Sequence, residues 1–428
     1  MWRRHTLIVM AHSKRILPSI ICLAAIFLPA VRAADQAKAK VRAVTGFITI
    51  DAKSYPSQFE AAAKFLTHVR ETIQAAGYEV QGIRITTQPF PEYTRGLSRA
   101  EALKVLRGIS ELAAKEHFSV SIGPAMSKDN DSKEPVDVLI DELSTPGNRV
   151  SGTIVTAGED GIHWNAVRQA AHLIKTVGER SPHGQGNSSF AATAMIKAYV
   201  PFYPGSWHPA EEPRSFAIGL ESANVVMDVF AREHDPRTAA AALTKALSVH
   251  ARAVEAAAMK AVAGSGWTYA GIDPTPAPRG PVSIGAAIES FTGAPFGSPG
   301  SETAAGIITR AVKAVPVKQA GYSGLMLAVL EDDTLLRRWT EGTYGIDSIL
   351  AYSAVCATGV DTVPLAGDTS EDTIARIIGD VATLAFKWNK PLATRLLPAP
   401  GKKVGDMTEF SGIYENTIIQ PLSGSPRR

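Results

Sequence analysis

Strand-like stretches alternate with helix signals through the first half of the chain, and this alternation constrains the fold more than any other feature. Three stretches are rich in β-branched and aromatic residues, which is typical of strands: residues 41–50, 78–86 and 118–122. Between them, Ser57 with Glu60 and Ser98 with Glu101 have the spacing of a capping box at a helix start. This order favours an α/β fold with a mainly parallel sheet covered by helices.

The same pattern continues along the chain. We expect a strand at residues 150–155 and helices at residues 166–177, 235–264, 302–315, 346–355 and 369–389. No internal repeat or convincing linker divides the sequence. We therefore expect residues 34–428 to form one domain.

The N-terminus has the features of a signal peptide. Lys14 and Arg15 precede an apolar run over residues 20–31, and Val31 and Ala33 provide the small residues that signal peptidase requires. The run is too short for a good membrane span. The sequence thus predicts a signal peptide at residues 1–33, cleavage before Ala34, and a periplasmic or secreted protein without a membrane anchor.

Export leaves one thiol in the mature chain. Cys22 leaves with the signal peptide, so Cys356 has no partner for an internal disulfide. It could be a nucleophile, or simply a small buried apolar residue. A position near the end of the helix expected at residues 346–355 disfavours the nucleophile, because the negative end of the helix dipole raises a thiol pKa.

The charge balance indicates the class of partner. The 428 residues carry a formal net charge of +3 and no block of basic residues, which disfavours nucleic acid as a partner. We expect a small-molecule ligand. The sequence leaves open whether the protein forms a homo-oligomer.

Four acids are the main candidates for a site. Glu221, Asp273, Asp361 and Asp368 each lie beside glycine, proline or an apolar strand-like run. Such carboxylates could meet at strand ends, where two could act as acid and base or several could bind a divalent cation. We assign Glu221 and Asp273 a catalytic role and Asp361 and Asp368 a metal role. The alternatives are structural: Asp368 as a helix cap, and Asp273 and Asp361 as acceptors for turn amides.

Basic and polar residues complete the candidate list. Arg395, Lys402 and Lys403 could clamp an anion, although the segment is not a phosphate-binding Walker loop and could equally be a solvated turn. Ser323 is a further ligand-binding candidate. His208 could be a general acid or base, but a histidine in a Trp/Pro turn is more often structural.

Several motifs together resemble those of the domain-of-unknown-function 711 family. They are residues 219–223 (GLESA), 271–273 (GID), 321–326 (GYSGLM), 356–361, 364–368 and 390–406. The resemblance covers residues 41–419 and implies a large α/β barrel like that of the pyruvate formate-lyase enzymes. It brings no agreed catalytic residues.

The resemblance does not imply a glycyl radical in this chain. Radical enzymes of that fold carry an Arg-Val-x-Gly-Tyr loop near the C-terminus, and the closest string here, residues 410–414, lacks the arginine. We interpret Gly412 as a turn glycine. The expected function is that of an exported, non-radical lyase or hydrolase acting on a small anionic or polar metabolite by acid–base or metal-assisted chemistry. The alternative is a non-catalytic periplasmic ligand-binding protein.

Overall fold

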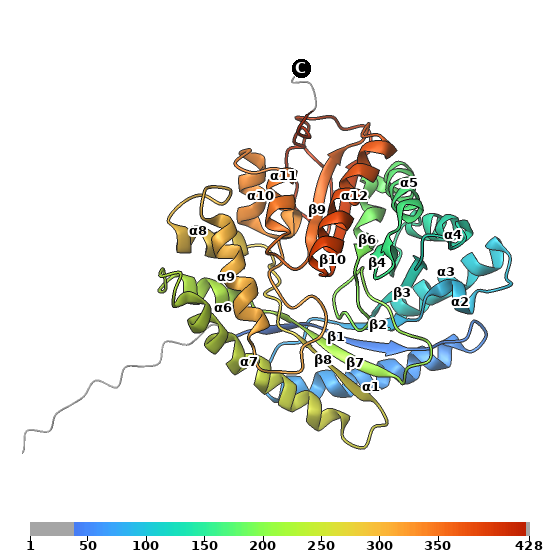
Figure 1. Ribbon diagram of the computed structural model, residues 1–428. Helices are drawn as coiled ribbons and strands as arrows, with labels where there is room; N and C mark the ends of the chain where they lie inside the picture. The colour runs from blue at the N-terminus through green and yellow to red at the C-terminus, as the bar shows by residue number, and fades with distance from the viewer. Residues whose placement is uncertain (1–37, 425–428) are drawn as a thin grey trace, which may run out of the picture. The chain divides into compact units, whose positions relative to one another are not determined.

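A ten-stranded sheet organises residues 38–424, the part of the chain that the computed structural model describes (Figure 1). The predicted signal peptide lies outside these residues. The strands pair in the order β8-β7-β1-β2-β3-β4-β6-β10-β9, and β5 pairs with β4 alone. Their bounds are β1 (Lys40–Ile48), β2 (Ile83–Thr87), β3 (Ser119–Met126), β4 (Val150–Gly158), β5 (Gly161–Ile162), β6 (Phe190–Ala194), β7 (Ser215–Glu221), β8 (Thr268–Asp273), β9 (Gly359–Ala366) and β10 (Leu392–Ala399).

The central strands of the sheet are parallel to one another, and the two strands on each flank are antiparallel to them. Strands β1, β2, β3, β4 and β6 are mutually parallel. On one flank β7 is antiparallel to β1 and parallel to β8, and on the other β10 is antiparallel to β6 and parallel to β9. The prediction of a mainly parallel α/β sheet is therefore confirmed.

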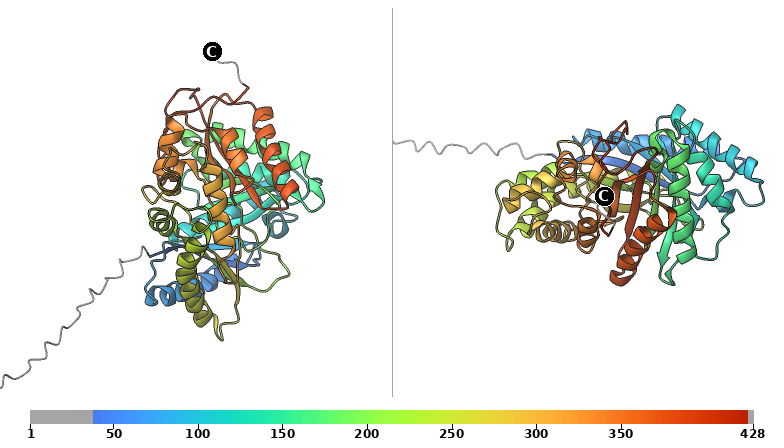
Figure 2. Two further views of the ribbon diagram at one scale, coloured as in Figure 1. Left: turned by 60° about the vertical axis from the view of Figure 1, so that its left-hand side comes forward. Right: turned by 90° about the horizontal axis from the view of Figure 1, so that it is seen from above.

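Helices cover the outer face of this sheet (Figures 1 and 2). Helices α1 and α7 pack on each other and on the β1, β2 and β8 region, while α3, α4, α5 and α12 cover β3, β4, β6 and β10. The bounds are α1 (Tyr55–Ala75), α2 (Phe90–Tyr93), α3 (Arg99–Lys115), α4 (Glu134–Leu143), α5 (Trp164–Arg180), α6 (Ala223–Phe230), α7 (Ala239–Val262), α8 (Ile284–Thr292), α9 (Ser301–Lys313), α10 (Asp333–Thr340), α11 (Ile346–Tyr352) and α12 (Glu371–Trp388), with 3₁₀ segments η1 (Pro182–Ser189) and η2 (Val329–Glu331). Between residues 38 and 424, every helix is too short or too polar to serve as a membrane span.

One of the two predicted capping boxes is confirmed. The Ser98 side chain accepts from the Glu101 amide and Glu101 accepts from the Ser98 amide, at the start of α3. The Ser57 box is wrong, because α1 begins two residues earlier at Tyr55 with Pro56 in its first turn. Asp368 is not the cap of α12 either, since the Ser370 hydroxyl accepts from Thr373.

The two faces of the sheet differ in chemistry. Gly46 and Gly152 face the helices, where an added Cβ would press on Leu66 of α1 and Leu139 of α4. Neighbouring side chains point the opposite way because strand side chains alternate. On this inner face the Thr45 hydroxyl donates to the Pro201 carbonyl and the Ser121 hydroxyl donates to the Ser206 carbonyl. The inner face is thus polar although it is buried.

Loops fill the inner face. A small apolar cluster joins the segment around Val200 and Phe202 to the segment around Tyr322 and Met326. The second of these segments forms a single β-bridge with each edge strand, Gln319 with Ile272 of β8 and Ala328 with Asp361 of β9. Apart from such single bridges, the ladder of described strands ends at β8 and β9.

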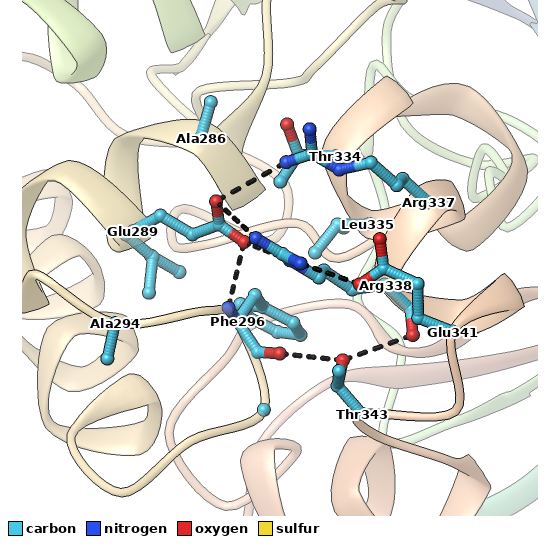
Figure 3. A network of polar contacts seen from close by, with 12 residues as sticks. Ala286, Glu289, Ala294, Phe296, Thr334, Leu335, Arg337, Arg338, Glu341 and Thr343 are labelled. Atoms are coloured by element: carbon cyan, nitrogen blue, oxygen red, sulfur yellow. Dashed lines mark hydrogen bonds and ion pairs between the residues drawn. The ribbon is translucent and has the colours of Figure 1, made fainter.

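A polar cluster joins α8 to α10 and fixes η2 between them. Figure 3 shows Glu289 of α8 accepting from Arg338 of α10, with Nε 2.6 Å from Oε1. Arg338 also lies 2.6 Å from Glu341. Buried Asp332 accepts from the Ile284 amide at the start of α8 and from the Leu335 amide at the start of α10. One carboxylate therefore caps two helices and holds the residue before it, Glu331, in place.

Candidate functional site

A cavity of about 240 Å³ lies on the inner face of the sheet. Its walls include Arg84 of β2, Ser119 of β3, Ser151 of β4, Asp361 of β9 and Arg395 of β10. These side chains come from the first residues of the parallel strands and from the flanking strands beside them. Parallel α/β sheets usually bind ligands at the carboxyl ends of their strands, so this cavity lies at the opposite end.

Five charged side chains form a continuous chain of ion pairs along the cavity. Arg42 lies 2.7 Å from Glu221 and 3.0 Å from Glu331. Arg395 lies 2.9 Å from the other oxygen of Glu331 and 2.6 Å from Asp361. Negative and positive groups alternate, so each guanidinium is shared by two carboxylates. Glu331, at the centre, is the carboxylate that holds both arginines.

Irregularities in the sheet position two members of this series of ion pairs, Arg42 and Asp361. The β1–β7 register shifts between Val41 and Ala43, which makes Arg42 the extra residue of a bulge. The β9–β10 register shifts beside Asp361, where Thr362 has φ 52°. Non-glycine residues rarely adopt that conformation, and it persists here within a strand. Bulges of this kind re-aim side chains, and here they aim two charged ones at the cavity.

Arg84 differs from the other two arginines. Its guanidinium forms no ion pair with any residue between 38 and 424; it donates to the Pro201 carbonyl at 3.4 Å and lies 4.9 Å from the centre of the Tyr203 ring. Burial, together with the nearby Arg42, lowers the pKa of Arg84 to about 10. It remains a cation at neutral pH. Arg84 is therefore a cavity-lining positive charge that is free to pair with a ligand.

The two carboxylates on Arg395 have different proton affinities. Burial raises the pKa of Asp361, and the negative Glu331 adds to the rise while Arg395 opposes it. Burial would also raise the pKa of Glu331, but Arg395 and Arg42 outweigh it and lower that pKa. The difference follows from geometry, since Glu331 is bonded to two guanidinium groups and Asp361 to one. Of the two carboxylates, Asp361 is therefore the one that takes up a proton more readily.

Hydroxyl groups complete the cavity wall. The Tyr414 hydroxyl accepts from Arg395 at 3.1 Å, and burial raises the pKa of Tyr414 and of Tyr322, which keeps both protonated. Thr358 also lines the cavity and is 3% exposed, and its hydroxyl has no hydrogen-bond partner among the described residues. A buried hydroxyl without a partner is costly unless a ligand or water occupies the space beside it.

The structure brings three of the predicted site residues together. Arg395 and Asp361 line the cavity, and Glu221 lies behind Arg42, where Gln81 also donates to it at 2.7 Å. Glu221 is therefore a positioning residue for Arg42.

Asp273 has a different role from the one we expected. It is fully buried at the end of β8, and it accepts from the Thr275, Tyr322 and Ser323 amides and from the Thr275 hydroxyl. Burial raises the pKa of Asp273 to about 6, despite these bonds. Its oxygens hold the segment that carries Tyr322. Ser323 belongs to the same turn, with its hydroxyl donating to the Ala320 carbonyl.

Four other candidates lie away from the cavity walls. Cys356 is buried in the main core, and Lys390 donates to its carbonyl. His208 is buried beside Tyr199, and its amide donates to the Thr87 carbonyl at the carboxyl end of β2. Lys402 pairs with Glu409 at 2.6 Å on the surface, and Lys403 is exposed.

The expected metal pair is also apart. Asp368 is exposed beyond β9, whereas Asp361 is buried against Arg395. Residues 38–424 contain no group of three or more histidine, cysteine, aspartate and glutamate side chains placed to share a metal ion.

Sequence reasoning missed Arg42, Arg84 and Glu331. Arg42 and Arg84 could have been identified from the sequence, because a basic residue inside a strand that is buried on both faces needs an ion-pair partner or a ligand. Glu331 carried none, since it stands in a run of three acids, 331–333, that looks like a solvated turn.

Comparison with known proteins places this chain among relatives of similar length. The family description "Uncharacterised ACR (DUF711)" matches residues 33–412. A UPF0210 protein of Pyrobaculum aerophilum is 33% identical over 378 residues, covering 85% of this chain and 82% of its own. UPF0210 proteins of Pyrobaculum arsenaticum and Methanopyrus kandleri are 29% and 27% identical, over 88% and 90% of this chain and 86% and 91% of theirs.

Proposed function

This chain belongs to the DUF711 family, whose relatives' names state no activity, and we propose from its cavity that it is an enzyme acting on a small anionic metabolite by acid–base chemistry. The reaction class is that of a lyase or hydrolase. Arg84 binds the anionic group of the substrate, and Asp361 transfers the proton.

The observation that carries this proposal is the unpaired guanidinium of Arg84. Arg84 is only partly exposed, and a partly buried cation next to Arg42 and Arg395 is unfavourable without an anion. All three carboxylates of the ion-pair chain are already engaged by Arg42 and Arg395. A carboxylate or phosphate ligand in the cavity supplies the missing charge, and guanidinium groups bind such anions in a bidentate manner.

Acid–base chemistry fits the difference in pKa between Asp361 and Glu331. Asp361 can take up a proton while Arg395 keeps its second partner, Glu331. Glu331 stays ionised and fixes both guanidinium groups. Tyr414 and Tyr322 remain protonated, so they can donate hydrogen bonds to charge that develops on the substrate.

A divalent cation fits this cavity less well than an organic anion does. A metal ion at Asp361 would have to replace Arg395 as the partner of that carboxylate. The proposed reaction therefore proceeds without such an ion, and it uses neither Cys356 nor His208.

A ligand screen with matched variants tests the proposal. Small carboxylates and phosphates are screened by thermal shift against the wild type, Arg84→Gln, and Arg149→Gln, which removes an exposed arginine at the same cavity. We expect stabilising acids to lose their effect in Arg84→Gln and to keep most of it in Arg149→Gln. Acids that stabilise Arg84→Gln as well as the wild type would refute the proposal.

The alternative, a non-catalytic binding protein, uses the same cavity. Each acid that binds is incubated with the wild type and with Asp361→Asn, and the products are followed by mass spectrometry. An enzyme converts the acid, and Asp361→Asn binds it without turnover. Binding without any product in the wild type would favour the binding protein.

We also propose that residues 1–33 are a signal peptide and that the mature protein is periplasmic or secreted. The family match starts at residue 33, so it leaves out residues 1–32. N-terminal sequencing of the protein from cell fractions tests the proposal. It predicts Ala34 as the first residue, and a cytoplasmic protein that keeps residues 1–33 would contradict it.

We propose further that the sheet is a barrel of the pyruvate formate-lyase kind. The bridges that Gln319 and Ala328 make to β8 and β9 support this, because one segment contacts both edge strands. In a barrel the Ala320 amide, which donates to the Ile272 carbonyl, exchanges slowly with solvent. Exchange as fast as in exposed loops would contradict closure.

A further inference from the structure

A second hollow of about 270 Å³ adjoins the cavity. Asn148, Ser188 and Ser189 line both, so the two share a wall. The second hollow lies between the turn after α4 and the 3₁₀ segment η1.

The walls of the second hollow are uncharged. Among the described residues that line it, Leu143 and two prolines contribute apolar surface, and Thr145, Gln185 and three serines contribute hydroxyl and amide groups. This contrasts with the first cavity, where Arg42, Arg84, Arg395, Glu331 and Asp361 meet. The combined space therefore has a charged end and an uncharged, hydrogen-bonding end.

The wall between the two hollows is held rigidly. Gly184 and Gly186 of η1 lie so close to the Pro398 and Leu143 carbonyls that an added Cβ would clash. Asn148 bonds to Val150 through both its amide nitrogen and its oxygen, at 2.8 and 2.6 Å. In contrast, the half-buried Ser188 hydroxyl forms no hydrogen bond with the described residues, which leaves it available to a ligand.

We infer that the substrate is an acid with a neutral, hydroxylated tail: its acidic group pairs with Arg84, and its tail extends past Ser188 into the second hollow. A hydroxylated chain suits that hollow because serine and threonine hydroxyls both donate and accept hydrogen bonds. An apolar tail would leave the Ser188 hydroxyl unpaired, and a second charge would find no partner there. The inference rests on the proposed function, since it assumes an acid at Arg84.

Four probe molecules test it by calorimetric titration: glycerate, a three-carbon hydroxy acid; gluconate, a six-carbon hydroxy acid; hexanoate, a six-carbon acid with an apolar tail; and sorbitol, a neutral polyol. The variants are Arg84→Gln, Ser188→Leu, which adds bulk where the two hollows meet, and Ser188→Ala, which only removes the hydroxyl. Thermal melts of each variant establish that it is folded.

We expect the wild type to bind gluconate about tenfold more tightly than glycerate or hexanoate, as a few added hydrogen bonds imply. Ser188→Leu abolishes this preference by weakening the binding of gluconate, and Ser188→Ala reduces the preference in part. Arg84→Gln weakens all three acids.

Two sets of results distinguish an error in the inferred binding site for the tail from an error in the proposed binding site for the acidic group. The inference is overturned if gluconate binds no better than glycerate and hexanoate, or if Ser188→Leu leaves the affinity for gluconate unchanged. In that case the second hollow does not hold the tail of the ligand. The proposed function still stands if Arg84→Gln weakens the binding of the acids. If no acid binds, or if Arg84→Gln alters none, the proposed function itself fails. Binding of sorbitol as tight as that of gluconate would also exclude an acid-specific site.

Discussion

Nε of Arg395 lies 2.6 Å from Oδ1 of Asp361 in the wall of the cavity, and Nη2 of the same guanidinium lies 2.9 Å from Glu331. Removing the charge of Asp361 therefore leaves Arg395 paired. Removing the charge of Glu331 leaves Arg42 paired with Glu221 alone and Arg395 paired with Asp361 alone.

Asp361→Asn is expected to stay folded and to lose turnover. We expect a loss of about 1 kcal/mol in the free energy of unfolding, against about 3 to 5 kcal/mol for Glu331→Gln, because the latter breaks a buried network at its centre. Urea denaturation measures both. Equal losses in the two variants would contradict the hierarchy of the two carboxylates.

The protonation of Asp361 predicts the pH dependence of turnover. Since burial raises the pKa of Asp361, its proton is retained to higher pH than in an ordinary aspartate. If Asp361 is the general acid, kcat falls as pH rises through that pKa; if it is the general base, kcat falls as pH drops through it. In Asp361→Asn, kcat should no longer change with pH in this range. A change that persists in the variant would show that another group titrates there.

Arg84→Gln is expected to separate binding from stability. Arg84 has no ion pair among the described residues and lies near Arg42, so its loss should leave stability unchanged or raise it by up to about 1 kcal/mol. Arg42→Gln, which removes the guanidinium partner of Glu221 and leaves Glu331 paired with Arg395 alone, should cost about 3 to 5 kcal/mol. The free energy of unfolding of both variants tests the contrast, and a large loss in Arg84→Gln would show that Arg84 is structural.

Thr358→Val is expected to weaken ligand binding without destabilising the protein. Its hydroxyl has no partner in the described part of the chain, so a methyl group in its place loses no hydrogen bond. Thr394 provides the control, because it is equally buried and its hydroxyl is also unpartnered, yet it is not among the cavity-lining residues. Thr394→Val should leave binding unchanged. Equal effects of the two variants on affinity would argue against a ligand at Thr358.

Asp273→Asn is expected to destabilise the protein by about 2 to 4 kcal/mol, because an amide accepts through one oxygen only and places a donor against the Tyr322 or Ser323 amide. Asp368→Asn makes the same change on the surface and should cost less than about 0.5 kcal/mol. Thermal melts compare the two. A stable Asp273→Asn that lacks turnover would restore the catalytic role we first assigned to this residue.

Acid should destabilise the protein through His208. Burial lowers the pKa of His208 to about 4, although Glu212 and Glu211 oppose the shift. In the unfolded chain the group titrates near its ordinary 6.5. Its contribution is therefore complete above about pH 6.5 and is lost as pH falls toward 4, by about 3 kcal/mol. His208→Phe should flatten the stability profile over that range, and an unchanged slope would assign the acid sensitivity to other groups.

The sequence predicted the architecture because its information is local. Ser98 and Glu101 meet within one helical turn, and the β-branched stretches identify strands before any partner is known. Boundaries were less certain. Pro56 moved the start of α1 ahead of the apparent box at Ser57, since proline fits the first turn so well.

The site was predicted only in part because its bonds are distant in sequence. Glu221 stood out as an acid in an apolar strand, and the same reasoning applies to Arg42 and Arg84. Such reasoning could not predict which residues form ion pairs, because Arg42 and its partner Glu331 are 289 residues apart in the sequence. Lys402 and Lys403 resembled a clamp, but they lie in the turn after β10, whereas Arg395 lies within the strand and faces the cavity.

Because the proposed ligand site lies at the amino ends of β2, β3 and β4, the opposite rim of the sheet has no part in that proposed site. The loop at residues 127–134 leaves that rim after β3, and Ser132 and Lys133 are exposed within it. A fluorophore or surface linkage attached at Ser132 should therefore report on or immobilise the protein without obstructing the approach of a ligand.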